Sequence, residues 1–148
     1  MPRKRSKFGV DLTEKGKQRR TYKGVLYDSV MEMQFYIEFV EPKLATGEII
    51  SCERQQVYLL QEGFVNRYGK KILPIKYKSD FDIVFKDGTK IVYDIKGRAD
   101  NTALLKRKMF WHKYPDIDYR WMTRSLKNGG WIEYDELKRI RREEKKGK

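Results

Sequence analysis

The residue types best suited to chemistry lie in one stretch, KSDFDIVFKDGTKIVYDIKG, residues 78–97. Two runs of β-branched and aromatic residues flank a turn signal at residues 86–88, which predicts a β-hairpin. A two-residue turn would mix the two faces of this hairpin. A three-residue turn, with its glycine in the left-handed region, keeps the faces separate. The three-residue turn therefore predicts that Asp80 lies directly opposite Asp94, with Lys96 two residues further along the same face.

Two carboxylates on facing positions repel each other, so such a pair predicts a bound cation. Mg²⁺ prefers oxygen ligands and typically binds one or two carboxylates together with waters and a phosphate. A lysine at the rim can position or deprotonate a water that attacks the phosphate. Asp82 lies on the same face and is a possible auxiliary ligand, although the three-residue turn favours Asp80. The alternative interpretation is a solvated polar face on an edge hairpin.

Length and charge predict one globular domain between two basic segments. The chain has 148 residues, 39% hydrophobic residues and a formal charge of +13. Residues 1–23 carry nine Lys or Arg and two acids, and residues 138–148 carry seven and two. We expect a flexible basic arm over 1–23, a single domain over 24–137 and a basic tail over 138–148. Such basic segments are typical of proteins that bind a polyanion, most often nucleic acid, although solubility or an acidic membrane would also explain them.

Several classes of function are excluded or disfavoured by the composition. No apolar segment is long enough to span a bilayer, and the basic start leads into no signal-peptide core, so no membrane partner is expected. Cys52 is the only cysteine, which excludes an internal disulfide and favours a cytoplasmic setting. One cysteine and one histidine exclude a zinc finger built from this chain alone. Motifs of Ser/His/Asp catalysis, HNH-type histidines and a phosphate-binding glycine loop are absent.

A helix is predicted within residues 24–47. Ser29 is a good N-cap and Glu32 follows three residues later, which is a capping box. Pro42 is expected to kink this helix or to mark its effective end. Capping is the default role of Glu32, but its place in the first turn also lets it point at a neighbouring strand.

The remaining pattern predicts an α/β (α+β) fold with a mixed central sheet flanked by helices. Residues 48–61 are expected to form one long strand or a strand pair, and residues 62–74 a hairpin loop. A helix capped by Asn101 or Thr102 follows the central hairpin. A strand over 117–123 and a final helix capped by Asp135 complete the order. Gln55 or Gln56, on a preceding strand, is a candidate for orienting a water or a phosphate.

The order of elements and motifs resembles the PD-(D/E)XK nuclease core, and most closely the phage endonuclease I type of Holliday-junction resolvase. The resemblance covers roughly residues 27–122 and rests on Ser29-Val30-Met31-Glu32, Asp80-Phe81, Asp94-Ile95-Lys96-Gly97 and Tyr114-Pro115-Asp116-Ile117-Asp118. The sequence departs from that family where Ser79 replaces a proline and Asp94 replaces a glutamate, and its hairpin is longer by several residues.

The resemblance implies a restriction-endonuclease-like core and a metal site. Glu32, Asp80 and Asp94 would be the metal-binding carboxylates, joined by the carbonyl of Ile95, and Lys96 the catalytic lysine. Mg²⁺ would be the metal, with Mn²⁺ able to substitute. The implied function is a metal-dependent, structure-selective DNA endonuclease that acts as a homodimer on branched DNA, such as a four-way junction, in the cytoplasm of a bacterial or phage-infected cell.

Phosphate contacts are expected from basic residues outside the acidic cluster. These are Arg67, Lys70, Lys71, Arg98, Lys106, Arg107 and Lys108. Two alternatives stay open. One is the same nuclease core with another target, in transposition, restriction or phage DNA processing. The other is a non-enzymatic basic protein that binds nucleic acid, in which the acidic cluster is a solvated face.

Overall fold

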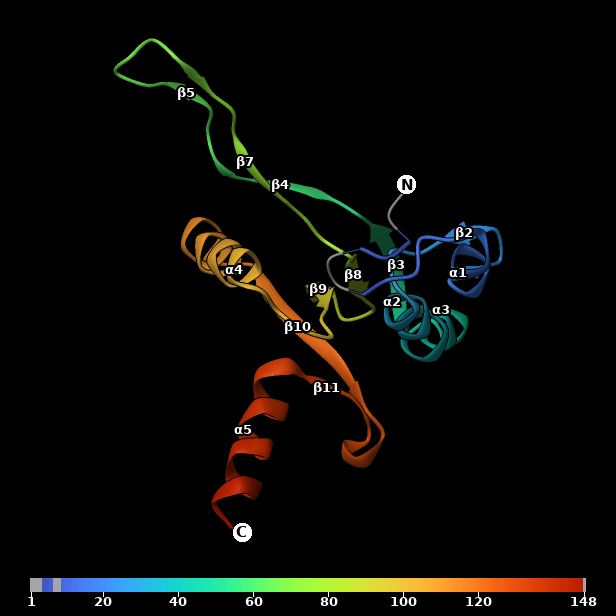
Figure 1. The fold of residues 1–148 in the computed structure, drawn as a ribbon. Helices are drawn as coiled ribbons and strands as arrows, with labels where there is room; N and C mark the ends of the chain where they lie inside the picture. The colour runs from blue at the N-terminus through green and yellow to red at the C-terminus, as the bar shows by residue number, and fades with distance from the viewer. Residues whose placement is uncertain (1–3, 7–8, 148) are drawn as a thin grey trace. The chain divides into compact units, whose positions relative to one another are not determined.

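The fold is described from a computed structural model, which covers residues 4–6 and 9–147 (Figure 1). The chain divides into two compact units that interleave along the sequence. The first unit comprises Met1–Glu48, Ile95–Arg98 and Met122–Lys148, and the second comprises Ile49–Asp94 and Ala99–Trp121. Because the units interleave, neither coincides with the predicted domain over 24–137, and the single-domain organisation stays a prediction.

A five-stranded mixed sheet organises the strands, in the order β11-β10-β9-β8-β3. The strand bounds are β3 Ile49–Arg54, β8 Phe81–Phe85, β9 Lys90–Ile95, β10 Asp118–Ser125 and β11 Gly130–Glu133. Strand β8 pairs antiparallel with both β3 and β9. Strands β9 and β10 are also neighbours, and helix α4 (Asn101–Lys113) connects them in the chain. Parallel neighbours require a crossover connection of this kind. The predicted α/β (α+β) class with a mixed central sheet and flanking helices is therefore confirmed.

The β8–β9 hairpin has the predicted register. Phe81 pairs with Tyr93, and Ile83 pairs with Ile91. The backbone N–H of Phe85 donates to the carbonyl of Thr89 at 2.8 Å, which leaves a turn of three residues. The last of these, Gly88, has φ +88°, a left-handed conformation that glycine adopts without strain. The predicted three-residue turn is confirmed.

Both faces of this hairpin are buried, which the sequence did not indicate. Phe81 and Ile83 are fully buried on one face, and Asp82 and Asp94 are only 4% exposed on the other. One physical reason is that tyrosines of two other strands cover the acidic face, since the hydroxyl groups of Tyr58 and Tyr77 bind Asp82 and Asp94. The alternative of a solvated face on an edge hairpin is therefore wrong for Asp82 and Asp94.

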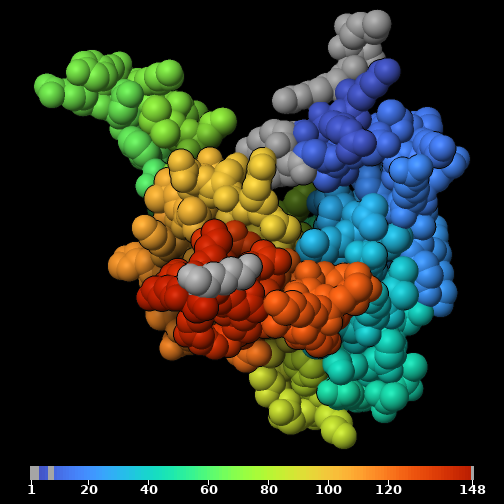
Figure 2. All heavy atoms as spheres, turned by 60° about the horizontal axis from the view of Figure 1, so that its bottom comes forward, coloured from blue at the N-terminus to red at the C-terminus, as the bar shows by residue number. Residues whose placement is uncertain are grey.

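A β-ribbon leaves the sheet after β3. The predicted strand of residues 48–61 is a pair, β3 and β4 (Val57–Gln61), separated by a bend at Gln55. Strand β4 pairs with β7 (Ile75–Lys78), and the loop beyond forms the small pair β5 (Phe64–Val65) and β6 (Lys71–Ile72). The hairpin loop predicted for 62–74 is confirmed, and its green ribbon stands out from the second unit in Figures 1 and 2.

Helix α4 closes the second unit over an aromatic cluster. Its N-cap is Asp100, whose carboxylate accepts the N–H of Ala103 at 2.8 Å, so the predicted caps at Asn101 and Thr102 are wrong. In the run Asp-Asn-Thr the first residue keeps an extended backbone and caps the helix before the other two. Phe110 is fully buried, and its ring lies within 6 Å of four tyrosine rings: Tyr58, Tyr77, Tyr114 and Tyr119.

The first unit contains the predicted helix of residues 24–47 as three consecutive segments. These are α2 (Val30–Phe35), the π-helical turn η1 (Tyr36–Val40) and α3 (Glu41–Thr46). The Ser29 hydroxyl accepts the N–H of Glu32 at 3.0 Å, so the predicted N-cap is confirmed. Pro42 has no N–H and its ring would clash with the preceding turn, and the wider π turn immediately before it relieves this conflict. Pro42 thus reshapes the helix without ending it.

The N-terminal segment contains regular structure where the sequence predicted a flexible arm. Helix α1 (Glu14–Arg19) begins at Thr13, whose hydroxyl accepts the N–H of Gly16, and strands β1 (Thr21–Tyr22) and β2 (Val25–Leu26) follow. Arg20 is buried and donates to the carbonyl of Tyr27 at 2.6 Å. The prediction is wrong for these residues because caps and a buried arginine hold them, without any apolar periodicity. Residues 1–3 and 7–8 of that arm lie outside the described residues.

The basic C-terminal segment is helical as far as residue 146. The predicted final helix is α5 (Tyr134–Lys146), which follows the short helix η2 (Leu126–Asn128) and β11. Its N-cap is Glu133, so the predicted cap at Asp135 is wrong by two residues. Residue 148 of the predicted tail lies outside the described residues. No helix in residues 4–6 and 9–147 combines the length and apolar character needed to cross a membrane.

The aromatic cluster around Phe110 predicts a large stability difference between two neighbouring positions of α4. Phe110→Ala removes a fully buried ring and is expected to lower the free energy of unfolding by about 3–5 kcal/mol. Trp111→Ala is the matched control, because Trp111 is 45% exposed and its loss leaves no such cavity. Urea unfolding followed by circular dichroism measures both. Equal losses for the two variants would contradict the packing of α4 described above.

Candidate active site

Asp94 lies buried at the end of β9, and a tyrosine hydroxyl holds its side chain. The Tyr77 hydroxyl donates to Oδ1 of Asp94 at 2.8 Å. Tyr77 comes from β7, so this bond ties the base of the β-ribbon to the central strand. A carboxylate held this way has a fixed orientation, which a binding or catalytic group needs.

Two stacked tyrosines form the surroundings of Asp94. The rings of Tyr77 and Tyr119 stack with their centroids 5.3 Å apart. Burial, more than any other cause, raises the pKa of Tyr77 well above its usual value, and the negative charge of Asp94 acts in the same direction. Burial likewise raises the pKa of Tyr119, with Asp94 the next cause. Both phenols therefore stay protonated at neutral pH, and Tyr77 acts as a permanent hydrogen-bond donor to Asp94.

Asp80 lies next to the β9 strand end that carries Asp94. It immediately precedes β8, and its backbone N–H donates to the carbonyl of Tyr93 at 3.2 Å. The last pair in the register of β8 against β9 is Phe81 with Tyr93, and Asp80 lies in the bend just before Phe81. Burial is the main cause of the raised pKa of Tyr77, and the charges of Asp94 and Asp80 both add to it, so both carboxylates lie near this phenol. Asp80 is only half-buried, whereas Asp94 is 4% exposed. The structure thus brings the two predicted carboxylate residues together at one end of the hairpin, with Asp80 nearer to solvent.

Asp82, the predicted auxiliary ligand, is engaged by other side chains. Its Oδ1 accepts the Ser79 hydroxyl at 2.5 Å, and its Oδ2 accepts the hydroxyl of Tyr58. The ammonium group of Lys90 lies 3.9 Å from the same Oδ2. These bonds link the ribbon to β8, so Asp82 has a structural role.

The two glutamines proposed to orient water or phosphate line the bend between β3 and β4. Gln55 has φ +55°, which is uncommon for a residue with a side chain, and its N–H reaches the carbonyl of Asp80 at 3.4 Å. The Gln56 side chain donates to the carbonyl of Arg54 at 2.9 Å, and the Gln56 carbonyl accepts the N–H of Ser79. Gln56 therefore stabilises the backbone of the bend through its side chain and its carbonyl. Of the two glutamines, Gln55 is the one whose backbone contacts Asp80.

The remaining residues of the predicted site belong to the first unit. Glu32 is 2% exposed in the first turn of α2, so it is far more buried than a simple capping glutamate needs to be. Ile95 is buried at the end of β9, and the N–H of Lys96 donates to the carbonyl of Met122 at 2.8 Å. Lys96 is half-buried and follows Asp94 by two residues.

The predicted phosphate-binding residues are divided among three segments. Arg67, Lys70 and Lys71 are exposed near the end of the ribbon, and Arg98 is exposed just after β9. Lys106, Arg107 and Lys108 lie on α4. Arg107 packs over Trp111 and Trp121, with its guanidinium carbon 4.6 and 4.0 Å from the two ring centroids. A cation stacked on two rings contributes to packing, so Arg107 has a structural role beside the predicted one.

The donor chemistry of the acidic pair suits a hard cation. No group of three or more His, Cys, Asp or Glu side chains at metal-binding spacing occurs among residues 4–6 and 9–147. Asp80 and Asp94 nevertheless bring two carboxylates to one hairpin end, which is the number that Mg²⁺ commonly takes from a protein, with waters completing its shell. These two carboxylates of the second unit therefore fit Mg²⁺.

Sequence reasoning missed the hydroxyl groups around the acidic pair. Tyr77 and Ser79 hold Asp94 and Asp82, and Tyr119 stacks on Tyr77. Ile75, Tyr77 and Ser79 alternate along β7 and its continuation, and this period of two is the signal that indicates inward-facing positions. The partner of each hydroxyl, in contrast, depends on how the ribbon folds back onto β8 and β9.

The fold and the site together define an α+β protein with a buried, tyrosine-bound aspartate at the end of a central strand. The chain belongs to the DUF1064 family, whose model matches residues 14–130 and is described as a protein of unknown function. A search of curated proteins finds no match. The family match begins at α1, so it includes most of the N-terminal segment that the structure describes as helix and strands.

The buried phenol of Tyr77 predicts a loss of stability at alkaline pH. Its pKa is raised in the folded state, whereas an unfolded tyrosine titrates near 10. The folded protein thus keeps a proton that the unfolded chain releases, so the free energy of unfolding falls as pH rises above about 10, by up to about 1.4 kcal/mol per pH unit for one phenol. Tyr77→Phe is expected to make this fall less steep.

Urea unfolding at pH 9, 10 and 11 measures the effect. Tyr68→Phe is the matched control, because Tyr68 is 83% exposed, and we expect it to keep the wild-type pH dependence. At neutral pH Tyr77→Phe also loses its bond to Asp94, at a cost of about 1–3 kcal/mol. If the stability of wild type and of Tyr77→Phe changed identically with pH, the pKa of the Tyr77 phenol would not be raised in the folded protein.

Proposed function

We propose that this chain is a metal-dependent DNA endonuclease that hydrolyses phosphodiester bonds and selects branched DNA, as Holliday-junction resolvases do. The observation that carries the proposal is the register of β8 against β9. In that register Asp80 directly precedes and Asp94 directly follows the paired residues Phe81 and Tyr93, and Lys96 lies two residues further along the chain. Two carboxylates followed by a lysine at this spacing suit metal-assisted hydrolysis of a phosphodiester.

The carboxylates are proposed to hold the metal. Asp94, fixed by Tyr77, and the more exposed Asp80 would be ligands, and the carbonyl of Ile95 would add a third oxygen. Glu32 is the further carboxylate that the sequence motif implies. Its 2% exposure supports a role beyond helix capping, since glutamates are rarely buried without a specific reason.

Lys96 is proposed to position the attacking water. When bound, Mg²⁺ would polarise the phosphodiester and neutralise the charge that develops on it. The lysine ammonium would hold a water in line with the bond that breaks, which lowers the entropic cost of the attack. The backbone bond of Lys96 to Met122 supports a fixed position for this residue.

DNA is the proposed substrate because of the distribution of charge. The net charge of +13 favours a polyanion, and exposed cations occur near the ribbon end at Arg67, Lys70 and Lys71 and after β9 at Arg98. Such contacts follow the backbone without reading its sequence. Two symmetric cuts in a four-way junction imply a homodimer, and DNA as substrate implies a cytoplasmic location.

The burial of Asp94 disfavours the alternative of a purely DNA-binding protein. In that alternative the acidic residues form a solvated face, whereas Asp94 is 4% exposed and bound by Tyr77. Burying a carboxylate costs free energy that a solvated face does not require. The other alternative is a nuclease that acts on another target, in transposition, restriction or phage DNA processing. Such a nuclease would have the same site, so only its substrate distinguishes it from the proposed enzyme.

Substitution of the proposed site residues is expected to abolish cleavage. Asp80→Asn, Asp94→Asn and Lys96→Ala should each lower the rate of cutting by about 100-fold or more, since each removes a group that stabilises the transition state. The assay follows a labelled four-way junction and a linear duplex with Mg²⁺. Asp87→Asn is the matched control, because Asp87 is an exposed carboxylate in the turn of the same hairpin.

Three outcomes decide among the interpretations. Paired cuts near the branch point, absent from the three variants and retained in Asp87→Asn, would support the complete proposal. Equal cutting of linear duplex would retain the nuclease and refute the selection of branched DNA. No cutting with Mg²⁺ or Mn²⁺, while DNA binding persists, would leave the binding protein as the function.

Metal binding by the acidic pair predicts stabilisation of the folded protein by Mg²⁺. A ligand that binds only the folded state at 100 times its Kd stabilises by about 2.7 kcal/mol. We therefore expect Mg²⁺ to raise the melting temperature of wild type and of Asp87→Asn, measured by differential scanning calorimetry. Asp80→Asn and Asp94→Asn should show little or no rise. The same rise in all four proteins would exclude these carboxylates as ligands.

A further inference from the structure

Helix α5 carries a stripe of positive charge along one face. Lys138, Arg141, Arg142 and Lys145 are spaced i, i+3, i+4 and i+7, which brings all four to the same side of the helix. None of the four has an acidic partner within 4 Å among the described ion pairs. In Figure 2, α5 (red) lies at the surface of the first unit, beside the orange segment of η2 and β11.

Three of the four acidic residues of α5 are paired with cations outside the stripe. Glu136 and Glu143 bind Arg139, with oxygen-to-nitrogen distances of 2.5 and 2.7 Å. Glu144 binds Lys127 of η2 at 3.0 Å. Partners outside the stripe thus neutralise these three carboxylates, and the fourth, Asp135, lies in the first turn, three residues before Lys138.

Such a stripe is unfavourable for the helix itself. Like charges at i, i+3 and i, i+4 repel, and each pair costs about 0.2–0.5 kcal/mol. Lys138 and Arg142, and Arg141 and Lys145, are both i, i+4 pairs. A bound anion would remove this repulsion, so the stripe suits a polyanion better than it suits the free protein.

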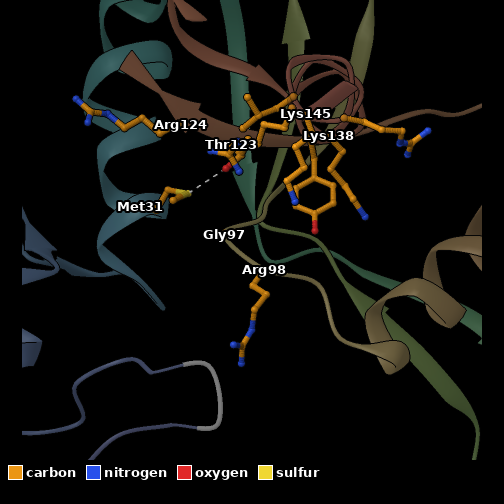
Figure 3. A pocket seen from close by; sticks show the side chains of 11 residues that line it. Met31, Gly97, Arg98, Thr123, Arg124, Lys138 and Lys145 are labelled. Atoms are coloured by element: carbon orange, nitrogen blue, oxygen red, sulfur yellow. Dashed lines mark hydrogen bonds between the residues drawn. The ribbon is translucent and has the colours of Figure 1, made fainter. Parts of the chain in front are cut away.

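The stripe lines a pocket of about 650 Å³ within the first unit (Figure 3). Figure 3 shows Arg98 on one side of Gly97 and Lys138 and Lys145 on the other. Arg124 also lines the pocket, but its guanidinium binds Glu38 at 2.8 Å, so its charge is already neutralised. The described residues that line the pocket include no aspartate or glutamate.

The rest of the lining combines small and apolar groups with the cations. Met31, Leu137 and Thr123 contribute, and the Thr123 hydroxyl lies 3.9 Å from the sulfur of Met31. Lys138 lies over the ring of Tyr134, 5.5 Å from its centroid. An aromatic ring beside several cations is typical of sites that hold a nucleic-acid strand, where the cations bind phosphates and the ring contacts a sugar or base.

We propose that this pocket binds the phosphodiester backbone of the DNA strand that is cut. The inference rests on the proposed function and deepens it. Gly97 and Arg98 line the pocket and directly follow Lys96 in the same unit. The pocket lining therefore begins one residue after Lys96 in the chain. The role of the pocket is to hold the backbone in register with the proposed catalytic lysine.

The test measures DNA affinity against salt with no divalent metal present, so that no cleavage takes place. The variant Arg141→Gln/Lys145→Gln removes two charges of the stripe. Its matched control, Lys15→Gln/Lys146→Gln, removes two exposed charges from helices of the same unit that do not line the pocket. Glutamine is a good helix former, so both variants keep their helices, which circular dichroism verifies. Fluorescence anisotropy with a labelled four-way junction gives the affinity.

Loss of two phosphate contacts is expected to lower the slope of log affinity against log salt by about 2, and the affinity at 0.1 M salt by roughly 10–100-fold. The control variant is expected to keep the wild-type slope. Equal losses in both variants would mean a general charge effect and would overturn the pocket. Unchanged affinity in the stripe variant would overturn it as well, as would a stripe-dependent attachment to acidic vesicles with DNA affinity unaffected.

The outcomes for the pocket and for the nuclease are separate. If wild type cuts DNA with Mg²⁺ but the stripe variant binds normally, the pocket is refuted and the nuclease is retained. If the stripe variant loses affinity but wild type cuts no DNA with Mg²⁺ or Mn²⁺, the pocket is retained as a DNA-binding site and the nuclease is refuted.

Discussion

The pairing of β8 with β9 is the constraint on which the candidate site depends. Gly88 adopts the left-handed conformation that closes a three-residue turn, and this turn length decides which side chains face each other. A register shifted by one residue would move every side chain of one strand to the opposite face. Asp80 would then no longer lie beside Asp94.

A network of hydroxyl groups makes the burial of the acidic residues possible. Tyr77 binds Asp94, and Ser79 and Tyr58 bind Asp82. Without such donors, each carboxylate would lose its hydration without compensation. All three hydroxyls come from β4, β7 and the residue that follows β7, so the ribbon supports the central strands as well as carrying exposed cations. Stability and the proposed chemistry therefore depend on the same contacts.

Charge is arranged differently around the acidic pair and along α5. Asp94 is buried and bound by the neutral hydroxyl of Tyr77, whereas the cations of α5 lie on one face, and Glu136 and Glu143 of that helix bind Arg139 instead. The first arrangement limits access to a small cation or a water, and the second favours an extended anion. Together they suit a protein whose substrate carries many phosphates, of which one meets the acidic pair.

The sequence by itself determined the local features: the α+β class, the three-residue turn, the Ser29 cap and the strand pair before the ribbon. Each depends on neighbouring residues, through backbone conformation or side-chain period, so a local pattern contains the necessary information. Tertiary structure decided the burial of Asp94, the engagement of Asp82 and the stacking of Arg107 on two tryptophans, because these need segments distant in sequence. It also decided that residues 13–26 fold, since Arg20 and Tyr27 hold them with a bond that no hydrophobic period indicates.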